Sequence, residues 1–354
     1  MIRFALVGCG RIAAKYAEIL SSGAVPDAKM VAACDIRPDR AAAIGTRYNI
    51  PTFVDMHQMM EVLHGQIDVI AILTESGNHA RHAIALASYG KMLLVEKPMA
   101  LTLADADEMI RVCDAARVRL SVVKQNRYNL PVVKLRQALD AGRFGRLVMG
   151  TVRVRWSRPQ SYYDQDAWRG TWAMDGGVFA NQASHHVDLL EWMLGEPASV
   201  FAYARTALVD IEAEDTGVAL IKFRNGALGL IEATTACRPR DLEGSVSILG
   251  ERGSVEIGGF AVNQMKVWEF VDKTPDDDDV LTQSRENPPD VYGFGHIRYL
   301  NEIIKAIRED APLLVDGLEG RKSLELITAI YESIETSREV ALRLIPTKCR
   351  LGVG

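Results

Sequence analysis

The first third of the chain alternates short apolar runs with segments in which apolar residues recur at helical spacing. The apolar runs are typical of buried strands and lie at residues 2–7, 29–35, 68–73, 92–95 and 119–123. The helical patterns between them cover Arg11–Ser21, Asp39–Tyr48, Met56–Leu63, His79–Tyr89 and Leu103–Ala116. Strands that alternate with helices of this length are joined by right-handed crossovers. The pattern therefore predicts an α/β domain with a parallel sheet over residues 1–124.

The pattern changes after about residue 125. Helical patterns cover 130–142, 296–308 and 319–337, and an Asn225-Gly226 pair between two alternating runs indicates a hairpin. The strand-like runs in this part are Leu147–Trp156, Ser199–Thr206, Thr216–Phe223, Leu228–Thr234, Glu243–Leu249 and Ser254–Ile257. This order predicts that residues 125–354 form an α+β domain with a large, open, mostly antiparallel sheet and helices on one face.

Composition narrows the class of protein. The chain has 354 residues, of which 48% are hydrophobic and 25% charged, and this suits two globular domains. A net charge of −5 argues against a nucleic-acid or membrane-surface partner. No signal peptide or membrane-spanning stretch is visible, and the five cysteines are scattered without a CxxC pair. We expect a cytoplasmic protein without a disulfide framework or a metal site.

A run of four aspartates within Thr274–Asp279 is the most acidic part of the chain. Its composition predicts a solvated surface loop. A calcium site is the alternative, but the run lacks the spaced ligands that calcium loops use.

The first candidate chemistry is the turn after the first apolar run. Gly8-x-Gly10-x-x-Ala13 combines a sharp turn at Gly8, a close backbone approach at Gly10 and a small residue where the helix meets the sheet. Asp35, at the end of the second run, stands at the spacing of an acid that binds the adenosine ribose. These residues predict a Rossmann-type dinucleotide-binding domain. Asp35 repels a 2′-phosphate and favours NAD over NADP, although Arg37 could accept such a phosphate or stack on the adenine.

The residues around the cofactor follow from this fold. The pyrophosphate is expected beside Gly8, Gly10, Arg11 and Ile12. Residues that follow the 68–73 strand border the nicotinamide half, and these are Thr74, Ser76, Asn78 and His79.

Two further segments contain candidate catalytic residues, which indicate that the protein uses the cofactor in a reaction. Glu96-Lys97-Pro98 directly follows a buried-type strand, where ligands of parallel sheets bind, although a surface ion pair is the alternative. From Gln182 onward apolar residues recur at helical spacing, which places His185 and Asp188 on one face. A histidine oriented by an acid is a candidate general base, whereas a structural histidine is the alternative, and His186 is expected to be structural.

Together, the glycine turn, Asp35, Glu96-Lys97-Pro98, and Gly176-Gly177 followed by His185-x-x-Asp188 resemble the Gfo/Idh/MocA oxidoreductase family over residues 2 to about 340. The resemblance implies that Lys97 and His185 face the sugar carbon that is oxidised. It also places further residues near the cofactor, namely Glu96, Lys97, Asn126, Trp168 and Arg169. Many members have an acid four residues before the histidine, where this chain has Asn181.

A narrower set of motifs is similar to one subgroup, the UDP-N-acetyl-2-amino-2-deoxyglucuronate 3-dehydrogenases, which shares the amide at Asn181. These motifs are 123–127, 156–163, 168–172, Asn181–His185, 211–216 and Tyr292–His296. The subgroup oxidises the sugar 3-hydroxyl of UDP-N-acetylglucosaminuronic acid with NAD, on the route to the diacetamido-uronic acids of bacterial surface polysaccharide such as lipopolysaccharide. Some similar enzymes reoxidise NADH in place with 2-oxoglutarate, and relatives assemble as dimers or tetramers.

The implied substrate lies between the domains and carries a diphosphate and a carboxylate. Candidates to meet it are Lys97, Lys124, Arg158, Tyr163, Asn181, Gln182, His185 and His296, with Arg238 and Arg240 as further cations. Either His185 or a desolvated Lys97 could be the base, and Asp188 could stabilise the imidazolium if it reaches the ring. Other readings remain open: another sugar or inositol dehydrogenase, a non-catalytic NAD sensor, or a glycosidase that uses NAD transiently.

Overall fold

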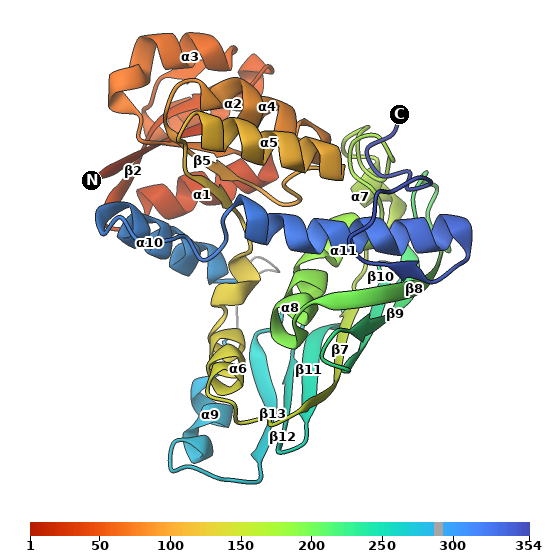
Figure 1. Ribbon diagram of the computed structural model, residues 1–354. Coiled ribbons are helices and arrows are strands. Elements are labelled where there is room, and N and C mark those ends of the chain that lie inside the picture. The colour runs from red at the N-terminus through yellow and green to blue at the C-terminus, as the bar shows by residue number, and fades with distance from the viewer. Residues whose placement is uncertain (287–292) are drawn as a thin grey trace. The chain divides into compact units, whose positions relative to one another are not determined.

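The computed structural model describes residues 1–286 and 293–354 and divides into two compact units (Figure 1). The first unit comprises Met1–Val123 and Ile297–Arg321, and the second comprises Lys124–His296 and Lys322–Gly354. Within the described residues, no helix combines the length and apolar character that crossing a membrane requires.

The return of residues 297–321 to the first unit differs from the expected division into 1–124 and 125–354. The Tyr299 hydroxyl lies 2.8 Å from Ser121 Oγ, and Arg119 Nη1 donates to the carbonyl oxygen of Ala306. An amphipathic pattern shows that a helix has an apolar face, but it does not show which body that face packs against.

The first unit contains a six-stranded sheet in which every neighbouring pair is parallel. In spatial order its strands are β3 (Thr52–Phe53), β2 (Ala28–Cys34), β1 (Ile2–Val7), β4 (Val69–Ile72), β5 (Met92–Val95) and β6 (Leu120–Val122). The parallel α/β prediction is confirmed. The sequence pattern missed β3 because its two residues are too few to show a period.

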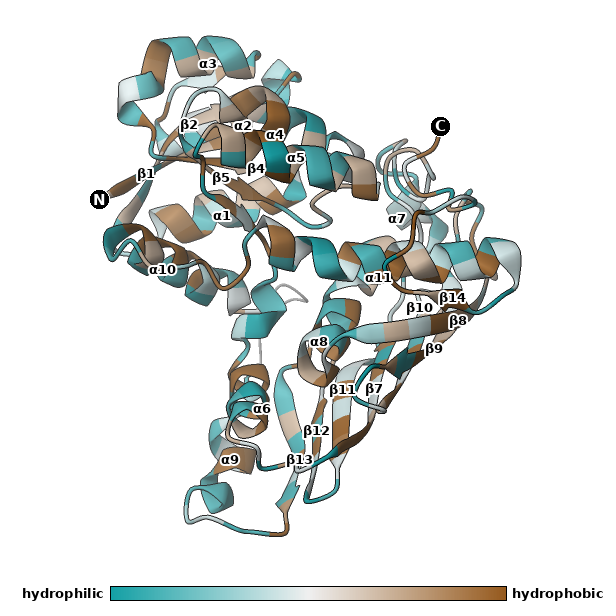
Figure 2. Ribbon diagram, viewed as in Figure 1, coloured by the Kyte–Doolittle hydropathy of each residue, from teal (hydrophilic) through white to brown (hydrophobic). Residues whose placement is uncertain are grey.

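The helices of this unit have the bounds that the apolar periodicity predicts to within about two residues. They are α1 (Arg11–Ser21), α2 (Pro38–Tyr48), α3 (Met56–Leu63), α4 (His79–Ala87) and α5 (Leu103–Ala115), with short 3₁₀ turns η1 (His64–Gln66) and η2 (Ser76–Asn78). The helices α4 and α5 lie side by side (Figure 1). Figure 2 shows apolar residues along β1 and β5 and a mixture of apolar and polar residues in α3 and α5. Buried parallel strands and two-sided helices produce this contrast.

The second unit contains an eight-stranded mixed sheet. In spatial order its strands are β13 (Gln264–Phe270), β12 (Gly253–Gly258), β11 (Glu243–Gly250), β7 (Leu147–Arg155), β10 (Leu228–Thr234), β9 (Thr216–Phe223), β8 (Pro197–Arg205) and β14 (Val340–Ala341). Only the β7–β10 pair is parallel among these described strands, so the prediction of a mostly antiparallel sheet is confirmed. The sequence pattern missed β13, where an irregularity opposite Glu256 and Ile257 breaks the alternation.

The helices of the second unit are α6 (Leu130–Asp140), α7 (Gln160–Tyr163), α8 (Ser184–Leu194), α9 (Asp277–Gln283) and most of α11 (Gly317–Thr336), with a 3₁₀ turn η3 (Gln125–Tyr128) and a π-helical turn η4 (Val178–Gln182). The helix α10 (Gly295–Arg308) belongs mostly to the first unit. The helix α8 packs on β7, β10 and β11. In α11, Ser333 Oγ accepts a hydrogen bond from the backbone N–H of Ala202 in β8.

The acidic run Thr274–Asp279 is not a simple loop, because its aspartates begin α9. Negative charges are stabilising at a helix N-terminus. Asp277 also accepts both a guanidinium bond from Arg143 at 2.7 Å and a bond from Trp268 Nε1 at 2.6 Å. These partners, which come from other elements, hold the pKa of Asp277 below its ordinary value.

The turn that leads into α8 is shaped by Glu214. Gly176 has φ +77°, and a Cβ on Gly177 would overlap both the carboxylate and the carbonyl oxygen of Glu214. The Glu214 Oε1 atom accepts from the backbone N–H of Phe179 at 3.0 Å and from the Tyr331 hydroxyl at 2.9 Å. The pair of glycines therefore allows a buried carboxylate to hold η4, the segment directly before α8.

Replacing Gly177 with alanine tests this close approach. We expect Gly177→Ala to lower the free energy of unfolding by about 2 kcal/mol or more, because the new methyl group must displace Glu214. Chemical denaturation measures the loss. The control is Gly65→Ala, where a Cβ meets nothing within 4 Å and we expect a change within about 0.5 kcal/mol. Equal stabilities for the two variants would contradict the packing argument.

Glu214 also predicts a pH dependence of stability. Burial raises the pKa of its carboxyl to about 7, from an ordinary value of 4.5. Between these pH values the native state holds a proton that the unfolded state has released, so this group makes stability fall as pH rises. We expect Glu214→Gln to remove up to about 3 kcal/mol of that dependence. Unfolding free energies at several pH values for both proteins check this, and parallel curves would show that Glu214 is ionised throughout.

Candidate active site

The glycine turn after β1 has the geometry of a phosphate-binding turn. Gly8 has φ +94°, and a Cβ there would lie 2.7 Å from the carbonyl carbon of Leu73 and from the backbone nitrogen of Thr74. Gly10 is the N-cap of α1, provides no side-chain cap and would direct a Cβ into open space. The first N–H groups of α1 are therefore not covered by a capping side chain, and this suits a pyrophosphate.

Asp35 lies beside this turn and is held by backbone groups. Its Oδ2 accepts from the N–H of Cys9 at 2.7 Å, and its Oδ1 accepts from the N–H of Arg37 at 2.9 Å. Each carboxylate oxygen keeps acceptor capacity for a ribose hydroxyl. Arg37 forms an exposed ion pair with Asp39 at 2.9 Å. Burial raises the pKa of the Cys9 thiol to about 12, so this cysteine is a neutral, small residue packed in the turn.

The residues after β4 mostly bond to one another. Thr74 Oγ1 lies 3.0 Å from His82 Nδ1, and Asn78 Nδ2 donates to Glu75 at 3.1 Å. Ser76 is buried.

His79 joins the end of β4 to the loop after β5. Its Nδ1 lies 2.7 Å from the carbonyl oxygen of Pro98, and its Nε2 lies 2.9 Å from that of Thr74. Both ring nitrogens thus contact the protein's own backbone. Burial lowers the pKa of His79, whereas the two carbonyl contacts favour its protonated form.

The Glu96-Lys97-Pro98 segment is not a surface ion pair. Glu96 is buried, accepts from the Tyr16 hydroxyl at 3.0 Å and accepts from the backbone N–H of Lys97 at 3.1 Å. The carboxylate therefore ties this loop to α1. Lys97 is half-buried directly after β5, and the Lys97–Pro98 peptide bond is cis.

In the second unit, Asp188 bonds to cations instead of reaching His185 as its orienting acid. Arg127 donates from Nε and Nη2 to the two Asp188 oxygens at 2.8 Å each, and Lys124 Nζ lies 3.6 Å from Oδ1. Burial opposes ionisation, but the two cations hold the pKa of Asp188 below its ordinary value. The group that meets His185 Nε2, at 2.9 Å, is the amide nitrogen of Gln125.

Lys124 and His186 both lie in the interior. Lys124 Nζ donates to Ser323 Oγ at 2.6 Å, and burial lowers the pKa of this ammonium although Asp188 opposes the shift. His186 packs edge-on against Trp156 with ring centroids 5.6 Å apart, and burial lowers its pKa to about 3. His186 is therefore a neutral structural histidine, as expected.

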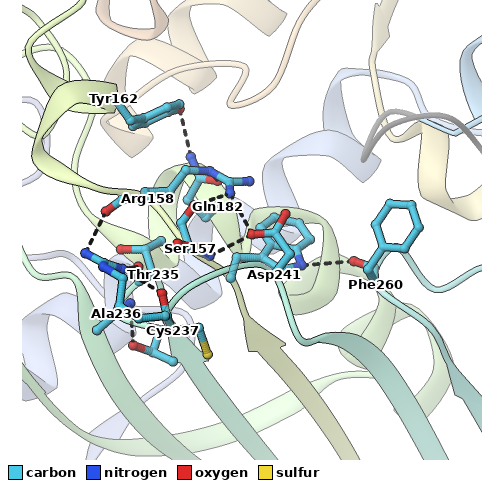
Figure 3. Close-up of polar contacts among 12 residues, drawn as sticks. Ser157, Arg158, Tyr162, Gln182, Thr235, Ala236, Cys237, Asp241 and Phe260 are labelled. Carbon is cyan, nitrogen blue, oxygen red and sulfur yellow. Dashed lines mark hydrogen bonds and ion pairs between the residues drawn. The ribbon is translucent and has the colours of Figure 1, made fainter.

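Arg158 is the centre of a polar cluster (Figure 3). Its Nε donates to Gln182 Oε1 at 3.1 Å and its Nη1 to Asp241 Oδ1 at 3.0 Å, while Gln182 Nε2 donates to the Tyr162 hydroxyl at 3.0 Å. The Arg158 guanidinium also lies over the rings of Trp156 and Tyr162. The structure thus brings together Arg158 and Gln182, which lie far apart in the sequence.

Other expected residues surround this cluster. Arg169 Nη1 donates to the Tyr162 hydroxyl at 2.9 Å, and its guanidinium carbon lies 4.6 Å from the Trp168 ring centroid. Arg238 donates to the carbonyl oxygens of Thr235 and Cys237, and Arg240 is exposed.

The remaining expected residues are more enclosed. Tyr163 is buried with its hydroxyl 3.1 Å from Thr235 Oγ1, and burial raises its pKa to about 12. Asn181 Nδ2 donates to Asp175, and Asn181 lies in η4, so it does not share a regular helix with His185. Asn126 and His296 are buried, whereas Tyr292 of the last motif lies outside the described residues.

Sequence reasoning missed Gln125, Arg127, Tyr162 and Asp241 as parts of these clusters. Their partners are up to 83 positions away in the chain, and no local pattern marks them. For Gln125 and Arg127 the signal was only their place in the segment 123–127, next to Lys124.

Comparison with known proteins agrees with this architecture. Residues 2–124 match the oxidoreductase-family NAD-binding Rossmann fold, and residues 136–342 match the C-terminal alpha/beta domain of the same family. The chain is similar to the WlbA dehydrogenase of Bordetella pertussis, crystallised with NADH and UDP-GlcNAcA (44% identity, 97% of this chain and 98% of that one, TM-score 0.92). The corresponding enzyme of Chromobacterium violaceum, crystallised with the same ligands, is 43% identical over 97% of this chain and 96% of that one, with a TM-score of 0.90.

A curated relative acts on a different polyol. Myo-inositol 2-dehydrogenase of Thermotoga maritima is 26% identical over 96% of this chain and 98% of its own length. The family matches together span both units, and their first part is an NAD-binding domain whose glycine turn and ribose acid are present in this chain. The chain therefore belongs to the Gfo/Idh/MocA family of oxidoreductases and is an NAD-dependent dehydrogenase.

Proposed function

We propose that the protein oxidises the 3-hydroxyl of UDP-N-acetylglucosaminuronic acid to the 3-keto nucleotide sugar. The observation that carries this proposal is the 43–44% identity, over 97% of the chain, with two dehydrogenases crystallised with UDP-GlcNAcA. The inositol dehydrogenase reaches only 26% over a similar length. The motifs of the narrower subgroup, including the amide at Asn181, point the same way.

The proposed chemistry uses His185 and Lys97. NAD, when bound, supplies the hydride acceptor. His185 takes the proton of the 3-hydroxyl, and Lys97 donates a hydrogen bond to the same oxygen and stabilises the charge that develops on it. Lys97 is the alternative base, because a desolvated lysine has a lowered pKa.

Most of the proposed cofactor site comes from the turn and loops of the first unit. The uncapped start of α1 and the open space beside Gly10 support pyrophosphate binding there, and Asp35 is oriented for the ribose. The proposed set, carried over from the sequence, is Gly8, Gly10, Arg11, Ile12, Asp35, Arg37, Thr74, Ser76, Asn78, His79, Glu96, Lys97, Asn126, Trp168 and Arg169.

Arg158 is the cation that we propose for the anionic groups of the substrate. Its Nε and Nη1 are used within the protein, whereas Nη2 has no hydrogen-bond partner in the described part of the chain. Gln182, Asn181 and His296 are proposed to act with it. The internal bonds of Lys124 and Tyr163 favour a supporting role for these two residues.

A second copy of the chain is the partner that we propose for the uncovered face of the eight-stranded sheet. The side chains of Tyr203, Val218, Leu220 and Leu228 are exposed, and cross-strand register places Tyr203 opposite Val218. Exposed apolar patches of this kind are typical of interaction surfaces, so we propose a dimer or tetramer.

The biological setting is a further part of the proposal. All five cysteines are free, which supports a reducing cytoplasm. The 3-keto product would enter the synthesis of a diacetamido-uronic acid of surface polysaccharide, and 2-oxoglutarate is the proposed acceptor if NADH is reoxidised in place.

The direct test is the absorbance of reduced nicotinamide when NAD and UDP-N-acetylglucosaminuronic acid are added to the protein, with and without 2-oxoglutarate. Without 2-oxoglutarate, we expect the absorbance of reduced nicotinamide to rise. When 2-oxoglutarate is present, we expect the UDP-sugar to be consumed. A response to free inositol or to other sugars alone would overturn the substrate proposal in favour of the wider family. Loss of a leaving group without net NADH would indicate glycosidase chemistry.

The roles of the two proposed residues predict specific variants. We expect His185→Asn to lower kcat by about 10²–10⁴-fold, the range that general acid–base catalysis contributes, and to leave NAD affinity unchanged. Stopped-flow rates and calorimetric titration with NAD measure the two quantities. His64→Asn changes an exposed histidine of the first unit and serves as the control. Full activity in His185→Asn would move the base to another group, with Lys97 next to be tested.

A further inference from the structure

The segment that precedes α6 is fixed against α8 by buried charges. Arg127 holds Asp188 with two bonds of 2.8 Å, and its guanidinium carbon lies 4.7 Å from the ring centroid of Trp192, one turn further along α8. Lys124 reaches the same carboxylate and also donates to Ser323 in α11. Breaking a buried pair of this kind leaves an uncompensated charge, so the position of the segment on α8 is strongly specified.

Gln125 lies between these two anchors and meets His185. Its Nε2 is 2.9 Å from His185 Nε2, and its side chain is 4% exposed. His185 and Asp188 are three residues apart on α8 and therefore share a face. Because Lys124 and Arg127 anchor their segment on Asp188, Gln125, which lies between them, is placed next to His185. Gly295 also packs closely against this segment, because a Cβ there would overlap the Gln125 carbonyl oxygen.

An amide is chemically suited to a histidine that changes protonation during a reaction. It carries a donor and an acceptor, and a half-turn of the amide group exchanges them. The amide NH₂ can donate to the imidazole lone pair at Nε2, and after the half-turn Oε1, which has no hydrogen-bond partner in the described residues, accepts from Nε2–H. The second arrangement leaves the lone pair of His185 on Nδ1, where the ring can take a proton. A carboxylate at this position would favour the imidazolium and raise its pKa.

We propose that Gln125 is the positioning residue of His185: its amide orients the imidazole by bonding to His185 Nε2, the task that the His-x-x-Asp spacing first suggested for Asp188. Asp188 acts one step away, by anchoring Lys124 and Arg127. This inference rests on the proposed role of His185 as the base.

Two variants of similar size test the role of the amide. Gln125→Met removes both polar groups, and we expect kcat to fall at least about 10-fold, a part of the general-base contribution, with the affinity for NAD unchanged. Gln125→Glu keeps a hydrogen-bonding side chain but adds a charge. We expect it to recover activity at high pH and to move the acidic limb of kcat/KM upward by about 1–2 pH units.

The controls keep the surroundings constant. The charged groups of the buried cluster beside this pair are Lys124, Arg127, Asp188 and Glu191, and every variant retains them. Gln137 is an exposed glutamine of α6, so Gln137→Met and Gln137→Glu are expected to leave rate and pH profile unchanged. A purely structural role for Gln125 would lower stability in the variants without moving the pH limb, and that result would overturn the proposal.

A measurement without substrate separates this inference from the proposed function. The titration of His185 is followed by NMR in protein labelled with ¹⁵N at the imidazole nitrogens, and the His185→Asn variant assigns its signal among the seven histidines. We expect Gln125→Glu to raise the pKa of His185 by the same 1–2 units. An unchanged titration would refute the contact itself, whereas a shifted titration together with no turnover of any UDP-sugar would refute the proposed function alone.

Discussion

The buried ion cluster around Asp188 is the constraint on which the arrangement of the second unit's candidate site depends. A carboxylate that is 2% exposed is stable in its charged form only when cations meet it, and Arg127 and Lys124 do so. Both cations come from one short segment, and Lys124 continues to Ser323 in α11. One charge thereby joins three elements, η3, α8 and α11, and the position of His185 relative to its neighbours follows from that junction.

The turn before α8 applies a second constraint to the same helix. Glu214 is buried, approaches the backbone where Gly177 has no side chain, and binds the N–H of Phe179 in η4. The Tyr331 hydroxyl bridges this carboxylate and the backbone N–H of Gly177. A π-helical turn leaves backbone groups that need partners, and these side chains supply them. The glycines of this motif are thus required by packing, whereas the histidine that follows carries the chemistry that we propose.

In the first unit, the candidate site follows from the topology of a parallel sheet. The strands β1, β4 and β5 are neighbours, and all run in the same direction. The turn after β1, the loop after β4 and the Glu96-Lys97-Pro98 loop therefore meet at one edge. Contacts such as His79 to Pro98 and Tyr16 to Glu96 then join these loops. Loops that carry function need such support, because they lack the hydrogen-bond ladders of the strands.

Local features of the sequence were sufficient to predict most helices and strands and the class of fold. Apolar periodicity gave α3 and the strands β9 and β10 with their observed bounds, and Gly8, Gly10 and Asp35 indicated a dinucleotide turn, because these signals arise within a few consecutive residues. The partners of the candidate base and of Arg158 required the tertiary structure. Asp188, the acid at the expected helical spacing, is bonded to Arg127. Gln125, which contacts His185, is 60 positions away from it in the sequence. Asp241, which binds Arg158, is 83 positions away from it. Burial decides such pairings, since a buried charge or amide takes whatever partner the folded chain brings within hydrogen-bonding distance, and spacing along a helix contains no record of that partner.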